Sequence, residues 1–90
     1  MLQAEIAELT NVYQSALASV SIIERLDTSD EDFLPPDIKT KREWVDALYR
    51  NRDHLTIILG RYTWPEDFDL APFNAAIAQA NARLDILRNG

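Results

Sequence analysis

The apolar residues of the first 26 positions recur at alternating spacings of four and three. Such spacings keep one strip of an α-helix apolar over three heptads, and that strip has to be covered by another surface. The pattern predicts a helix over residues 2–26, which ends ahead of Pro35 and Pro36 because adjacent prolines cannot continue a helix. We call its apolar strip the seam; it consists of Leu2, Ile6, Leu9, Tyr13, Ala16, Val20 and Ile23.

A second, wider apolar stripe predicts a helix over residues 37–60. Asp37 suits the N-cap position, and residues 40–43 (TKRE) form a capping-box pattern that allows a start three residues later. Gly60 is expected to end the helix as a left-handed C-cap. The stripe consists of Trp44, Leu48, Asn51, Leu55, Ile58, Leu59 and Tyr62.

A third segment repeats the spacings of four and three and predicts a helix over residues 69–88. Asp69 suits its N-cap position, and Pro72 is tolerated in a first turn. Three amphipathic helices joined by short corners predict an all-α fold, an antiparallel three-helix arrangement in a single domain of residues 1–90. A helical hairpin with a small third arm is a variant that the pattern leaves open.

The composition of this 90-residue chain excludes several classes of function. The chain has no cysteine, so disulfides, thiolate metal sites and cysteine nucleophiles are ruled out. No apolar run approaches the roughly 20 residues of a membrane helix. The net charge of −6 disfavours nucleic acid, which binds clustered Lys and Arg, and steers the protein toward basic surfaces. We expect a cytoplasmic protein whose negative charge also keeps it in solution.

Few residues offer catalytic or ligand-binding chemistry. His54 is the only histidine and lies at the edge of the second stripe, where a lone histidine is usually a boundary residue. The acidic run at residues 27–32 (DTSDED) lacks the central glycine and terminal glutamate of a calcium loop. We therefore expect no enzyme activity, no metal, no cofactor and no small-molecule substrate.

Several apolar residues lie off the three stripes and are candidates for contact with a partner. Ile22 lies away from the seam, Tyr49 is displaced from its stripe, and Ile57 points among charged residues. A row of alanines on the third helix allows close approach of another helix. The predicted interface comprises Ile22, Tyr49, Ile57, Trp64, Phe68, Ala75, Ala78 and Ala82. These residues favour self-association or a protein partner.

The corner at residues 60–72 (GRYTWPEDFDLAP) concentrates aromatic, acidic and proline residues. Pro65 suits a first helical position, so a short helical turn is predicted at about residues 65–68. Trp64 and Phe68 are expected to fold inward and close the end of the bundle. The alternative is that Trp64 stays exposed as an anchor for a partner, since tryptophan is enriched among interface hot spots.

The run NRDHLTIILGRYTWPEDFDLAPFNAAIAQAN, at residues 51–81, resembles small helical proteins encoded in the structural regions of tailed phages and prophages. The residues that carry the likeness are His54, Leu55, Ile57, Leu59, Trp64, Glu66, Asp67, Pro72, Ala76 and Ile77. The resemblance covers about the C-terminal 40 residues. It implies a component of a virion or of its assembly, located in the virion and acting by contact.

These observations predict a non-enzymatic structural or interaction protein that acts through helix–helix contacts. The alternative is an acidic inhibitor or adaptor that docks on a basic surface of a host protein. Its contact points would be the acidic corners at residues 27–37 and 66–69. Salt separates the two hypotheses, because screening weakens steered acidic binding while an apolar contact persists.

Overall fold

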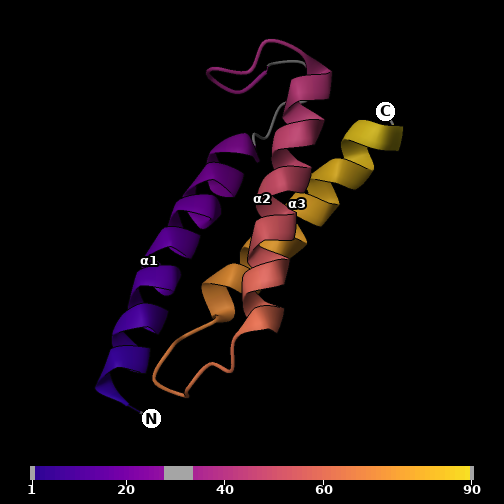
Figure 1. The fold of residues 1–90 in the computed structure, drawn as a ribbon. Coiled ribbons are helices and arrows are strands. Elements are labelled where there is room, and N and C mark those ends of the chain that lie inside the picture. Colours follow the sequence, from indigo (N-terminus) through magenta and orange to yellow (C-terminus); the bar gives the residue numbers. More distant parts are fainter. Residues whose placement is uncertain (1, 28–33, 90) are drawn as a thin grey trace.

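A computed structural model describes residues 2–27 and 34–89 of the chain, and these ranges form three helices. They are α1 (Gln3–Leu26), α2 (Lys41–Arg61) and α3 (Ala71–Asn89). Consecutive helices run in opposite directions, and each helix packs against the other two (Figure 1). The predicted all-α, antiparallel three-helix arrangement is therefore confirmed. Most of the acidic corner at residues 27–37, including its acids at 30–32, lies outside the described residues.

The bundle is elongated, with extents of 49 × 21 × 18 Å and a radius of gyration of 14.7 Å. A compact chain of this length has a radius of gyration of about 12 Å. The elongation follows from the length of the helices, since α1 alone, with 24 residues, spans about 36 Å at ~1.5 Å per residue. None of the helices in the described ranges is long and apolar enough to cross a membrane.

The core lies between the three helices and is made by the predicted stripes. Leu48 and Leu55 of α2 are fully covered, as is Ile23 of the seam. Trp44 is also fully covered, and its indole N–H donates to the Leu26 carbonyl at 2.8 Å, so burial leaves this polar group satisfied. The core cluster consists of Ala16, Val20, Ile23, Leu26, Trp44, Ala47, Leu48, Leu55, Ile58, Phe73, Ala76, Ala80, Leu84 and Leu87.

The start of α2 follows the capping-box pattern at residues 40–43. The Thr40 hydroxyl accepts a hydrogen bond from the Glu43 N–H at 3.1 Å, and the Glu43 carboxylate accepts one from the Lys39 N–H at 3.0 Å. The start predicted at Asp37 is wrong, because Asp37 has φ 69° and lies in a turn closed between residues 35 and 38. That turn needs a positive φ at its third residue, which aspartate tolerates better than most side chains.

The left-handed cap predicted at Gly60 is wrong. The helix continues to Arg61, and Tyr62, which follows it, has an extended backbone. No glycine in the described ranges has a positive φ. The indole N–H of Trp64 donates to the Ile58 carbonyl at 3.3 Å. This carbonyl is one of the four that a helix end leaves without an intrahelical partner, so a side chain beyond the helix does part of the capping.

The start of α3 lies two residues after the predicted one. Asp69 precedes the N-cap, and its carboxylate accepts a hydrogen bond from the Ala71 N–H at 3.0 Å. The Leu70 carbonyl accepts the first helical bond, from the Asn74 N–H at 3.1 Å. Asp69 thus satisfies a free N–H of the first turn, as a capping residue does, from one position farther out.

Candidate partner-binding surface

The eight residues predicted as a partner interface come from all three helices and from the corner between α2 and α3. Ile22 and Tyr49 are half-buried against the core. Ile57 stands on the outer side of α2 with 59% of its surface exposed. Three members of the predicted interface are exposed on α3, namely Ala75, Ala78 and Ala82. Trp64 and Phe68 are brought together at the corner between α2 and α3.

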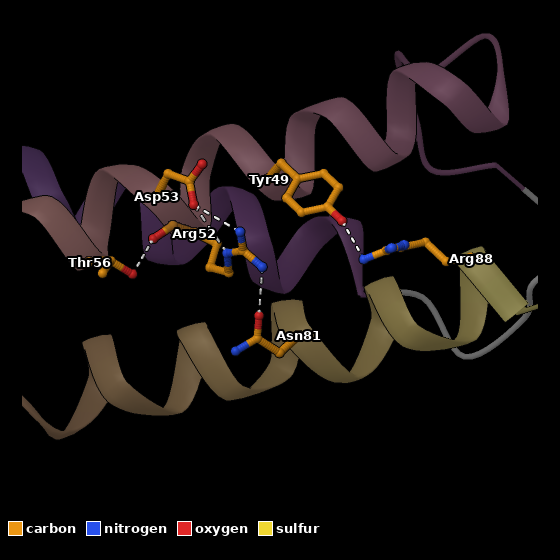
Figure 2. A network of polar contacts seen from close by, with 6 residues as sticks. All are labelled: Tyr49, Arg52, Asp53, Thr56, Asn81 and Arg88. Carbon is orange, nitrogen blue, oxygen red and sulfur yellow. Dashed lines mark hydrogen bonds and ion pairs between the residues drawn. The ribbon is translucent and has the colours of Figure 1, made fainter.

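Tyr49 is engaged within the chain. Figure 2 shows Arg88 of α3 donating to the Tyr49 hydroxyl at 2.8 Å. The guanidinium of Arg52 lies 4.7 Å from the centroid of the Tyr49 ring, donates to Asn81 of α3 at 3.0 Å and pairs with Asp53 at 2.9 Å. The network joins α2 to α3, and Tyr49 takes part in it through both its hydroxyl and its ring.

Trp64 and Phe68 belong to an aromatic cluster in the corner between α2 and α3. This corner lies at the end of the bundle where α1 begins (Figure 1). Their ring centroids are 5.3 Å apart and lie 6.2 and 5.4 Å from that of Tyr13 in α1. Tyr13 also contacts Phe73 of α3, with 5.0 Å between centroids, and donates its hydroxyl to the Asp69 carbonyl at 2.8 Å. The predicted inward folding is confirmed, although Trp64 and Phe68 remain half-buried.

Residues 65–68 form a single turn, in which the Phe68 N–H donates to the Pro65 carbonyl at 3.1 Å. A turn is therefore present where one was predicted, although residues 65–68 are not helical. It places Pro65 and Phe68 beside the first turns of α1. Together with Ile6 and Asp67 they line a hollow of about 280 Å³.

The first two residues of the seam are uncovered. Leu2 is 70% exposed and Ile6 is 44% exposed, whereas Leu9, the next seam residue, is 6% exposed. Leu2 is the extended N-cap residue that precedes α1, and its carbonyl accepts a hydrogen bond from the Ile6 N–H at 3.1 Å. With Pro65 and Phe68 they form an apolar area that we call the N-terminal surface.

Sequence reasoning missed this surface because it placed the whole seam in the core. From residue 2 to residue 23 the seam spans about 31 Å at ~1.5 Å per residue. The buried stripes of α2 (residues 44 to 58) and α3 (residues 73 to 87) each span only about 21 Å. The seam is therefore about 10 Å longer than either stripe that packs on it. The difference depends on which stripe positions are buried, because the stripe predicted for the second helix extends to Tyr62, which is only half-buried.

Acidic side chains flank the N-terminal surface on both sides. Glu5 and Glu8 line a second hollow of about 250 Å³ that Tyr62 closes from the end of α2. Asp67 lines the hollow on the opposite side of the seam. Arg61 is the basic residue nearest in sequence to Pro65 and Phe68. It lines the adjoining groove between α1 and α2. A partner that covers this part of the seam would therefore meet carboxylates on both sides of the N-terminal surface.

His54 lies in that separate groove, which has a volume of about 300 Å³. The groove is lined by Asn11, Val12, Ser15, His54, Ile58, Arg61 and Tyr62. None of these residues carries a carboxylate that could orient the imidazole as a general base. In residues 2–27 and 34–89, no group of three or more His, Asp or Glu side chains is arranged to hold a metal ion.

No family model, curated protein or solved structure matches this chain. The geometry of the N-terminal surface is therefore the main basis for a functional hypothesis.

Proposed function

We propose that this protein is a non-enzymatic structural or interaction component that acts through helix–helix contact at the N-terminal surface. The observation that carries the proposal is the exposure of Leu2 and Ile6, which continue the buried seam of α1 past the end of its cover. A partner helix laid over them would extend the packing that α1 already makes in the core.

Exposure of a single apolar residue would not support such a role, because isolated exposed apolar residues are normal. Ile57 is an example, since it stands alone on α2. Leu2 and Ile6 differ because they are the first two residues of the seam, four positions apart, and Ile6 adjoins the half-buried Phe68 across a hollow. Contiguous apolar areas of this kind mark interaction sites more often than scattered residues do.

The resemblance of the C-terminal residues to small helical phage proteins gives this contact function a setting. We propose that the contact is made within a virion or during its assembly. The acidic adaptor remains the second candidate, favoured by the carboxylates of Glu5, Glu8 and Asp67 at the edges of the surface.

Affinity capture with matched variants tests the proposal. The tag belongs at the C-terminus, which lies at the end of the bundle opposite the N-terminal surface (Figure 1). Wild type, Leu2→Ser/Ile6→Ser and Ile57→Ser are compared by quantitative mass spectrometry. We expect a specific protein, or further copies of the chain, to be retained by wild type and Ile57→Ser. With the double variant, the amount of retained protein should fall at least about tenfold, which is the effect expected when one important interface contact is truncated.

The Ile57→Ser variant is the control because it removes an equally apolar and more exposed side chain than Ile6 from another part of the surface. Neither variant alters the net charge. If no captured protein distinguishes the double variant from Ile57→Ser, contact at the N-terminal surface is not the function.

A further inference from the structure

The charge around the N-terminal surface identifies the kind of partner that fits it. Resting on the function proposed above, we infer that the partner is a short amphipathic helix of another protein, with Lys or Arg on both borders of its apolar face.

The length of the partner helix follows from the uncovered part of the seam. About 10 Å of seam extends past the buried stripes of α2 and α3, which is two turns of helix at ~5.4 Å per turn. Apolar side chains spaced by three and four residues would lie along Leu2 and Ile6. One of them would enter the hollow between Ile6 and Phe68, as an anchor residue enters a pocket.

The basic borders follow from the positions of the carboxylates. Glu5 lies on one side of the seam, beside Tyr62, and Asp67 lies on the other, beside Phe68. Lys and Arg suit these positions because their aliphatic stems cover apolar surface while their charged ends reach the carboxylates. The net charge of −6 also steers a basic segment toward the chain before contact.

The same carboxylates disfavour other occupants. In a symmetric dimer, the same patch of each copy meets its equivalent, so Glu5, Glu8 and Asp67 of both copies would be brought together. Such like-charge juxtaposition opposes association. Nucleic acid and anionic lipid present phosphates, which the acidic edges would repel.

Binding of synthetic peptides tests the inference directly. The probes are three fluorescein-labelled, two-heptad peptides with identical leucine positions and with Lys, Gln or Glu at the polar positions. Affinity is measured by fluorescence anisotropy. The Lys peptide should bind wild type at least about tenfold more tightly than the Gln peptide, a difference of ~1.4 kcal/mol. The Glu peptide should show no binding. The preference of the protein for the Lys peptide over the Gln peptide should shrink as the Debye length falls from ~10 Å at 0.1 M salt to ~3 Å at 1 M.

Two pairs of variants locate the binding site. Ile6→Ser should weaken binding of the Lys peptide about tenfold, because it removes an anchor contact, whereas Ile57→Ser should leave binding unchanged. The triple variant Glu5→Gln/Glu8→Gln/Asp67→Asn should also weaken binding. Its control, Glu24→Gln/Asp46→Asn/Asp85→Asn, removes the same charge from exposed positions elsewhere and should have a much smaller effect.

Three results would overturn the inference. Equal losses in the two triple variants would mean that the peptide senses only the total charge. Equal losses in Ile6→Ser and Ile57→Ser would mean that the seam is not the site. A dimer in sedimentation experiments that is lost in Leu2→Ser/Ile6→Ser would mean that a second copy covers the seam.

Failure of the inferred partner charge can be distinguished from failure of the proposed contact function. If the Lys peptide fails to bind while affinity capture still yields a protein that depends on Ile6, then the contact function stands and the charge of the partner is wrong. If capture shows no dependence on Ile6 either, both proposals fail.

Discussion

Leu55 and Ile57 are two positions apart on α2 and chemically alike, but the fold uses them differently. An α-helix turns by about 100° per residue, so the two side chains point to nearly opposite sides. Leu55 is fully covered in the core, whereas Ile57 is 59% exposed. The apolar periodicity of the sequence predicts this difference, because Leu55 lies on the stripe of the second helix and Ile57 lies off it.

Alanine substitution should separate the two residues in stability. Leu55→Ala should lower the free energy of unfolding by about 2–5 kcal/mol, because it leaves a cavity in a packed core. Ile57→Ala should change it by less than about 0.5 kcal/mol, as is usual for surface positions. Urea denaturation followed by circular dichroism measures both values. A loss below about half a kcal/mol for Leu55→Ala would contradict the packing of α2 against its neighbours.

Tyr49 shows what periodicity misses at this scale. Its displacement from the stripe suggested a partner contact. In the structure, Arg88 donates a hydrogen bond to its hydroxyl, and the guanidinium of Arg52 lies over its ring. Arg88 is 39 positions away in the sequence, so its approach depends on how α3 packs beside α2. A single-sequence pattern carries no information about such a pairing.

At the scale of elements, the cap at the start of α2 could be read from the sequence, whereas the cap at its end could not. The start of α2 depends on Thr40 and Glu43, which are three residues apart and recognisable as a capping pattern. Its end depends on Trp64 beyond the helix, which donates to a carbonyl of the last turns. Trp64 is held in turn by Tyr13 of α1, a contact between distant parts of the chain. Gly60 gave a local signal for a left-handed cap, and the tertiary contacts override it.

Gly60→Ala distinguishes the two descriptions of this helix end. Gly60 has a helical conformation, and a Cβ added there meets no atom within 4 Å. Alanine should therefore stabilise the protein by about 0.5–1 kcal/mol, since glycine is a poor helix former. A left-handed cap would give the opposite sign, because alanine is strained at positive φ. Thermal and urea denaturation measure the change, and a destabilised variant would restore the cap predicted from the sequence.

At the scale of the whole molecule, the buried stripes of α2 and α3 are shorter than the seam of α1. Fold class, helix order and most core positions follow from periodicity, since each amphipathic helix needs cover for one side. The candidate site does not follow from periodicity, because the pattern marks Leu2 and Leu9 as equivalent. Leu2 and Leu9 differ in burial because α2 ends and the chain enters the aromatic corner between their levels along α1. The packing of Trp64 and Phe68 against Tyr13 determines where this happens.

The boundary between folding and binding should therefore fall inside the seam, between Ile6 and Leu9. Leu9 is 6% exposed, so Leu9→Ala should cost at least about 2 kcal/mol of unfolding free energy. Ile6 is 44% exposed, so Ile6→Ala should change stability by no more than about 0.5 kcal/mol. Both substitutions shorten an aliphatic residue in the same helix, which makes each the control for the other. Urea denaturation of the isolated protein gives the two values. Equal costs would mean that the bundle itself covers Ile6, and the N-terminal surface would then be core instead of a place for a partner.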